Sequence, residues 1–185
     1  NRRAESKSQQ LQGEALELTV EDHLRRLFPG DTFEPVGTGR RGADILQTVF
    51  ENGRACGTIL WEAKQTQSWQ ASWLRKLRDD QRDAGAEIVV TQVFYDVDAC
   101  RKFIQDCRAA GIHVPIIPGV MPIQTWSSLQ RMSTYCKVAV PDAVTKAMEP
   151  FKDNDQDVKE FGVRFACEMI RTLVEPGLAP GVHFY

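Results

Sequence analysis

The sequence lacks several features that identify particular classes of protein. It has five cysteines, an odd number without a Cys-x-x-Cys pair, so neither a disulfide framework nor a zinc site is expected. No apolar run approaches the roughly 20 residues that a membrane helix needs, and no signal peptide is visible. The net charge of −2 gives no overall cationic field for nucleic acid. These absences predict a cytoplasmic protein that makes no use of a membrane.

What remains is an ordinary globular composition. The chain has 185 residues, of which 42% are hydrophobic, enough to bury one core or two small ones. It begins at Asn1 rather than an initiator Met, and Tyr185 falls inside an expected strand. We therefore expect a fragment of a longer protein.

Hydrophobic periodicity predicts an α/β protein. Helices are expected over residues 9–28, 68–84, 97–110, 125–136, 142–149 and 155–174. Strands are expected over residues 33–36, 43–50, 56–63, 87–95, 114–120 and 182–185. The Asn52-Gly53 pair predicts a hairpin between the second and third strands. Apolar residues recur at helical spacing in the last helix and are expected in the core: Phe161, Phe165, Met169 and Leu173.

Acidic and basic side chains follow the two strands of this hairpin. Alternation along a strand places Glu62 and Lys64 on one face, and the hairpin brings Asp44 to the neighbouring strand. Glu14 lies on the preceding helix as a further carboxylate. Carboxylates can hold Mg²⁺, and a nearby lysine can orient a water or stabilise charge developing on a phosphate. The set predicts metal-dependent phosphodiester cleavage.

The same residues resemble the PD-(D/E)xK, or restriction-endonuclease-like, nuclease superfamily over residues 8–90. The segments that carry the resemblance are 8–14, 41–44, 57–64 and 76–82. It implies that Asp44 and Glu62 bind Mg²⁺, that Lys64 acts at the attacking water, and that Glu14 is an accessory ligand. It also implies that Gln65 is a polar neighbour of the site. Arg40 and Arg41, in a glycine-rich loop beside the acidic residues, are the candidates for contact with the phosphates of DNA.

The second half of the chain resembles methylenetetrahydrofolate reductase. The segments that carry this resemblance are 89–96, 115–123, 149–155 and 180–185. It implies the last three strand–helix units of a flavin-binding (β/α)₈ barrel, with FAD as cofactor and folate as substrate. Gln92 corresponds to a residue that contacts folate in that family. Three strands cannot close such a barrel, so this half is expected to be inactive as a reductase.

The two resemblances meet between residues 82 and 91, which indicates a chimera of segments 1–87 and 88–185. The expected architecture is a mixed sheet with a restriction-endonuclease-like core, continued by the strand–helix units of the second half. Three functions compete. They are a Mg²⁺-dependent nuclease carried by the first half, a flavin- and folate-dependent reductase fragment, and an inactive structural hybrid. The first is preferred because its key residues are all present.

Overall fold

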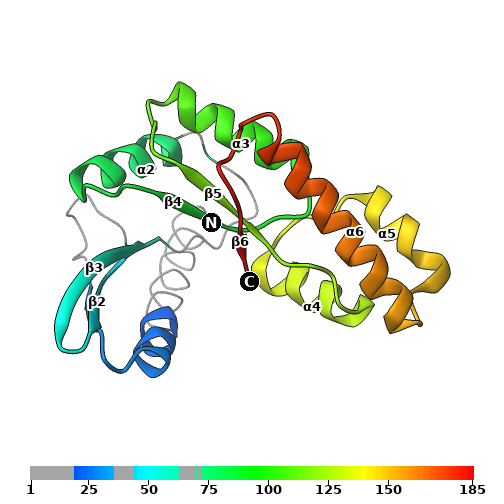
Figure 1. Ribbon diagram of the computed structural model, residues 1–185, viewed down its shortest axis with the longest axis horizontal. Coiled ribbons are helices and arrows are strands. Elements are labelled where there is room, and N and C mark those ends of the chain that lie inside the picture. The colour runs from blue at the N-terminus through cyan, green and yellow to red at the C-terminus, as the bar shows by residue number, and fades with distance from the viewer. Residues whose placement is uncertain (1–18, 36–43, 63–69, 71) are drawn as a thin grey trace, which may run out of the picture. The chain divides into compact units, whose positions relative to one another are not determined.

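The computed structural model describes residues 19–35, 44–62, 70 and 72–185. They belong to two compact units, Asn1–Gly85 and Ala86–Tyr185 (Figure 1). Each unit contains its own three-stranded sheet. Within the described residues, no helix combines the length and the apolar character needed to cross a membrane.

The first unit is built on an antiparallel sheet. Its elements are a helix over residues 19–27, the strands β1 (Thr32–Pro35), β2 (Ile45–Glu51) and β3 (Arg54–Trp61), and the helix α2 (Ser72–Asp83). The strands lie in the order β1-β2-β3. Asn52 and Gly53 have φ values of 52° and 76°. Positive φ at both central residues matches the right-handed twist of a hairpin, which confirms the prediction made from this pair.

A small core joins the helix to this sheet. Leu24, Phe33 and Ile45 are buried together. Beside them the buried side chain of Gln47 accepts a hydrogen bond from Trp61 Nε1 at 2.9 Å and donates one to Asp31 at 2.5 Å. The amide is thus satisfied at both ends, which is what its burial requires.

The second unit alternates strands and helices. Its elements are β4 (Val89–Val93), α3 (Val97–Ala109), β5 (Ile116–Val120), α4 (Trp126–Cys136), α5 (Asp142–Met148), a 3₁₀ turn (Glu149–Phe151), α6 (Asp155–Val174) and β6 (His183–Phe184). The strands lie in the order β4-β5-β6 and are all parallel. Parallel neighbours need crossover connections, and here helices supply them.

Helix α6 supplies much of the core of this unit. Met169 and Leu173 are buried, and Phe161 and Phe165 stack on each other with ring centroids 5.9 Å apart. The core position predicted for these four residues is confirmed. Asn154 begins the helix, because its side-chain oxygen accepts hydrogen bonds from the backbone N–H groups of Gln156 and Asp157.

The predicted α/β class is confirmed, but the predicted mixed sheet is wrong. The described strands form one purely antiparallel and one purely parallel sheet, each with its own order. The reason lies in the connections. A two-residue hairpin joins β2 to β3, whereas whole helices separate β4, β5 and β6. The described elements do not show a restriction-endonuclease-like core.

Candidate functional site

The carboxylates predicted as metal ligands lie at neighbouring strand ends in the first unit. Asp44 precedes β2, is half-buried, and donates its backbone N–H to Trp61 O at 2.9 Å. Glu62 follows β3. The sequence-based expectation that the hairpin brings these two positions to one end of the sheet therefore agrees with the strand pairing of Ile45 with Trp61.

The cation beside Glu62 is a lysine of α2. Lys76 Nζ donates to Glu62 Oε2 at 2.6 Å and to Asp80 Oδ2 at 2.8 Å, and Asp80 is buried. Partial burial alone would lower the pKa of Lys76. The hydrogen bonds to Asp80 and Glu62 and their negative charges outweigh it, so the pKa is raised above its usual value. An ammonium group therefore already bridges the two carboxylates.

The remaining nuclease residues fall outside the described part of the chain. These are Glu14, Arg40, Arg41, Lys64 and Gln65. Among the residues that are described, no group of three or more His, Cys, Asp or Glu side chains is placed to hold a metal ion. What the described part of the first unit shows at these positions is an ion-pair cluster.

Gln92 lies in the second unit, on β4. Its side chain is exposed, and the side-chain amide makes no hydrogen bond to any described residue. One face of the sheet is covered, since Ile116 and Val120 of β5 are buried and Val120 packs with Ala166 and Met169 of α6. Gln92 is an exposed polar side chain of this largely apolar sheet.

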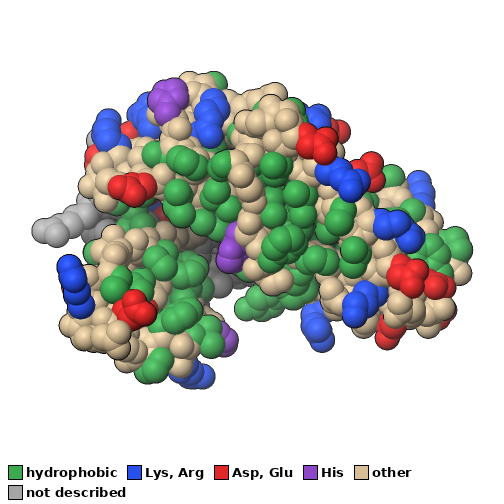
Figure 2. Space-filling view, viewed as in Figure 1, with side chains coloured by type: hydrophobic (Ala, Val, Ile, Leu, Met, Phe, Trp, Pro, Cys, Tyr) green, Lys and Arg blue, Asp and Glu red, His purple; other side chains and the backbone are tan. Residues whose placement is uncertain are grey.

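The other face of the sheet carries Val90 and Tyr185. Val90 is 48% exposed and Tyr185 58%. Figure 2 shows hydrophobic side chains gathered where β4, β5 and β6 lie in Figure 1. Parallel sheets are ordinarily buried on both faces, so an exposed apolar face of this kind is a surface that favours a ligand or further protein.

The backbone around Gln92 is held by three residues that the sequence did not single out for function. Thr91 Oγ1 donates to Gln92 O at 2.8 Å and accepts the N–H of Gly119 at 3.1 Å. Tyr185 Oη donates to Thr91 O at 2.9 Å. No local pattern in the sequence indicates the partner of Gly119.

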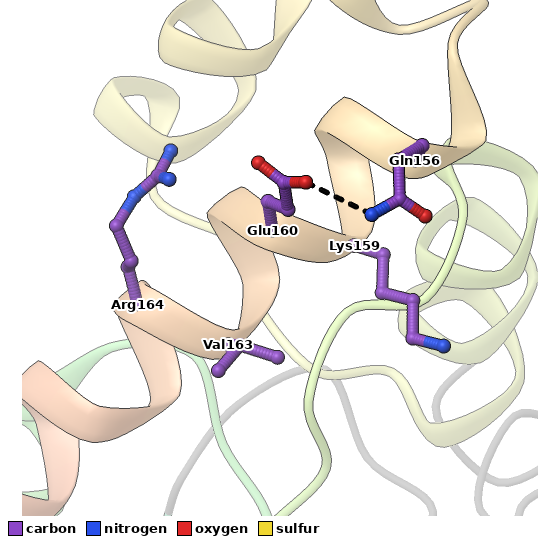
Figure 3. A pocket seen from close by; sticks show the side chains of 5 residues that line it. All are labelled: Gln156, Lys159, Glu160, Val163 and Arg164. Atoms are coloured by element: carbon purple, nitrogen blue, oxygen red, sulfur yellow. Dashed lines mark hydrogen bonds between the residues drawn. The ribbon is translucent and has the colours of Figure 1, made fainter.

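A shallow hollow lies along the exposed side of α6 (Figure 3). Its lining side chains are Gln156, Lys159, Glu160, Val163 and Arg164. Within it Gln156 Nε2 donates to Glu160 Oε1 at 2.9 Å. All five side chains come from a single helix at i, i+3 and i+4 spacing, so this is a shallow helix surface and not a site built by converging elements.

Comparison with known proteins shows that the chain is similar to methylenetetrahydrofolate reductases. A family model described as methylenetetrahydrofolate reductase matches residues 60–185. Methylenetetrahydrofolate reductase (NADH) 1 of Arabidopsis thaliana is 47% identical over 103 residues, which are 56% of this chain and 17% of that protein. Methylenetetrahydrofolate reductase 1 of Schizosaccharomyces pombe is 44% identical over 103 residues, with the same two shares.

Solved structures also align with the chain, and one of them is titled as an uncharacterized protein from Clostridium thermocellum that binds two copies of 5-methyl-5,6,7,8-tetrahydrofolic acid. The TM-score is 0.41 at 19% identity, over 60% of this chain and 40% of that one. A similarity this low assigns neither fold nor ligand.

These findings overturn the nuclease prediction. The reductase family model begins at residue 60 and runs through Glu62 and Lys64, two of the three residues on which the prediction rested. In the structure Glu62 is paired with Lys76. The Mg²⁺ and DNA predicted with the nuclease lose their basis with it. A Glu-x-Lys pattern at a strand end was too common a surface feature to carry that conclusion.

Proposed function

The chain belongs to the methylenetetrahydrofolate reductase family, and from that premise we propose that residues 88–185 form a folate-contacting part of the family's catalytic barrel. The chain spans 17% of the length of the two relatives compared above. Its second unit has three parallel strands, and three strands cannot close a barrel of eight. Reductase turnover is therefore not expected from this chain alone. Residues 1–87 are proposed to be a separate α/β segment.

The observation that carries the proposal is the place of Gln92. A side-chain amide offers two donors and one acceptor oxygen, and this one is exposed on the strand that also carries the exposed Val90. The pterin ring of a folate is a planar heterocycle whose edge carries both donors and acceptors. An apolar surface with a single bifunctional amide matches such a ring, because ligand sites combine apolar lining with few oriented polar groups.

The FAD implied by the family resemblance does not fit the described residues of this unit. A dinucleotide diphosphate is commonly held at a helix N-terminus. In α3 the side chain of Asp96 already accepts the N–H of Ala99, and Asp98 adds negative charge. In α6 Asn154 caps the helix and Asp155 and Asp157 follow. These acidic first turns repel phosphate, so we assign no diphosphate site here and no step that uses the flavin.

The start of helix α4 is likewise not assigned as a diphosphate site, for a different reason. Its first turn is closed by a capping box in which Thr125 Oγ1 accepts the N–H of Ser128 and Ser128 Oγ accepts that of Thr125. Two N–H groups at this helix start, those of Thr125 and Ser128, are thus engaged by the helix's own side chains. A flavin would need residues beyond those described.

Binding of 5-methyltetrahydrofolate to the purified chain tests the proposal. Titration followed by NMR should shift signals of β4 and β5, and Gln92→Ala should weaken binding about 2- to 10-fold, the effect of one net hydrogen bond. Gln156→Ala, which changes an exposed glutamine on α6, is the matched control. Identical affinities of the wild-type chain and Gln92→Ala, or no binding by either, would contradict the proposal.

A further inference from the structure

Strand β4 carries one more residue than its neighbour beside Gln92. Val90 pairs with Ile117 and Val93 pairs with Gly119, so Thr91 and Gln92 together oppose Pro118. This is a β-bulge. Proline has no N–H to donate to the ladder and is tolerated in sheets mainly at edges and bulges. The bulge interrupts the ladder at the one position of β5 where a donor is missing, and bulges change the direction in which a side chain points.

The hydroxyl of Thr91 replaces the interrupted ladder. Its oxygen accepts the N–H of Gly119, the next donor on β5, at 3.1 Å. Its proton goes to the carbonyl oxygen of Gln92 at 2.8 Å. One side chain therefore connects the two strands across the bulge and at the same time fixes the peptide that follows Gln92.

Tyr185 and Gly119 complete the arrangement. Tyr185 Oη donates to Thr91 O at 2.9 Å, which holds the peptide that precedes Gln92. A Cβ on Gly119 would lie 2.5 Å from Thr91 O and 3.0 Å from the carbonyl carbon of Gln92. It would also meet the ring of Tyr185. Only glycine allows the bulge and the tyrosine ring to approach β5 this closely.

We infer that Thr91 is a positioning residue, which holds Gln92 in the orientation that binds folate through its bridge to Gly119. The inference rests on the proposed function, because Gln92 is the proposed ligand contact. It goes beyond that function because it attributes the orientation of Gln92 to the Thr91 hydroxyl, with Tyr185 holding the preceding peptide. Thr91 itself need not touch the ligand, since its hydroxyl is already engaged as donor and as acceptor.

The experiment is a double-mutant cycle on the intact chain with 5-methyltetrahydrofolate as the probe. Thr91→Val keeps the shape and removes the hydroxyl, and Thr91→Ser restores it. If Thr91 acts through Gln92, Thr91→Val weakens binding about as much as Gln92→Ala, roughly 2- to 10-fold. The double variant then weakens it no further, because coupled residues are non-additive. Thr91→Ser should bind like the wild type. Thr172→Val, which removes a hydroxyl on α6 that donates to Glu168 O, is the control.

Hydrogen exchange supplies a readout that does not depend on ligand. The amide of Gly119 should exchange faster in Thr91→Val than in the wild type or Thr91→Ser, whereas the amides of α6 should not change. Fully additive losses in the cycle, or an unchanged Gly119 amide, would overturn the positioning role while leaving folate binding intact. No binding by the wild-type chain would overturn the proposed function and this inference together. Failure of the positioning role and failure of folate binding therefore give different results.

Discussion

Gly162, in the middle of α6, packs against the backbone carbonyl of Ile123. A Cβ at this position would lie 2.9 Å from the carbonyl carbon and 3.0 Å from the Cα of Ile123, and closer still to the carbonyl oxygen. Ile123 is buried in the same core as Val158 of α6. The helix therefore reaches the segment that follows β5 only because residue 162 has no side chain.

We expect Gly162→Ala to destabilise the chain despite the better helix propensity of alanine. The propensity gain is about 1 kcal/mol, whereas forcing a methyl group against buried backbone costs about 1–3 kcal/mol, and more where the backbone cannot move. Urea unfolding of the second unit measures the difference. Gly181→Ala is the control, because a Cβ there meets nothing within 4 Å. Equal midpoints for the two variants would contradict the close packing of α6.

Lys76→Met should destabilise the first unit because it removes the ion pair of the buried Asp80. Loss of a charged hydrogen-bond partner to a buried carboxylate costs about 1.5–3 kcal/mol, and methionine keeps most of the packing of the lysine stem. Chemical unfolding followed by tryptophan fluorescence measures it. Lys102→Met is the control, since its partner Asp106 is 34% exposed. A larger loss of stability in Lys102→Met than in Lys76→Met would show that burial of Asp80 does not determine the cost.

The same lysine predicts a loss of stability at high pH. The pKa of Lys76 is raised from 10.5 in the folded chain because Asp80 and Glu62 outweigh the effect of burial. Folding then favours the charged form, so its stabilisation is full below pH 10.5 and is lost as the pH rises through the raised pKa. Unfolding at pH 9, 10 and 11 should show this loss, and Lys76→Met should lack it. An equally steep loss in Lys76→Met would assign it to other groups.

Local sequence patterns predicted most of the helices and strands. The alternation and helical spacing of apolar residues located the strands and helices, and Asn52-Gly53 and Asn154 lie at turns and caps that depend only on neighbouring residues. Such features are readable because the atoms involved are close in the chain. The same holds for the core face of α6, where Met169 and Leu173 were expected to be buried and are.

The site was harder to predict because its contacts join distant residues. The Thr91 hydroxyl bonds to a residue 28 positions away and the Tyr185 hydroxyl reaches back 94 positions. Both depend on a one-residue irregularity in strand register, which no local pattern records. The pairing of Glu62 with Lys76 has the same origin, since it needs the helix to return to the strand end. Without it, Glu62 looked available for a metal.

Asn154→Ala tests the start of α6, the longest helix among the described residues. The side-chain oxygen of Asn154 accepts hydrogen bonds from Gln156 N at 3.1 Å and Asp157 N at 3.4 Å. Removing such a cap costs about 1 kcal/mol, because two backbone donors lose their acceptor. Thermal unfolding should show a lower midpoint for Asn154→Ala, whereas Asn154→Asp should retain the cap. A midpoint of Asn154→Asp as low as that of Asn154→Ala would argue against the capping role.

Two cysteines of α3 should be protected from alkylation in the folded chain. Cys100 and Cys107 are buried, and burial raises the pKa of Cys100 from 9.0 to about 12 and that of Cys107 to about 11. Only the thiolate reacts, so both protonation and lack of access slow the reaction. At pH 8, N-ethylmaleimide followed by peptide mapping should label the exposed Cys56 and Cys167 first. Equal labelling of all four without denaturant would contradict the packing of α3.

The buried thiols also predict how stability falls in alkali. Because folding keeps both thiols protonated, their contribution is full below pH 9 and is lost as the pH rises toward 11 and 12. Cys100→Val and Cys107→Val fill similar space without a titrating group, so the double variant should lose less stability between pH 8 and pH 11 than the wild type. Unfolding in urea at the two pH values measures this. Cys167→Val, at an exposed position of α6, should behave like the wild type. If the double variant loses as much stability as the wild type, the loss arises elsewhere, for example at Lys76, and the variant Lys76→Met separates the two.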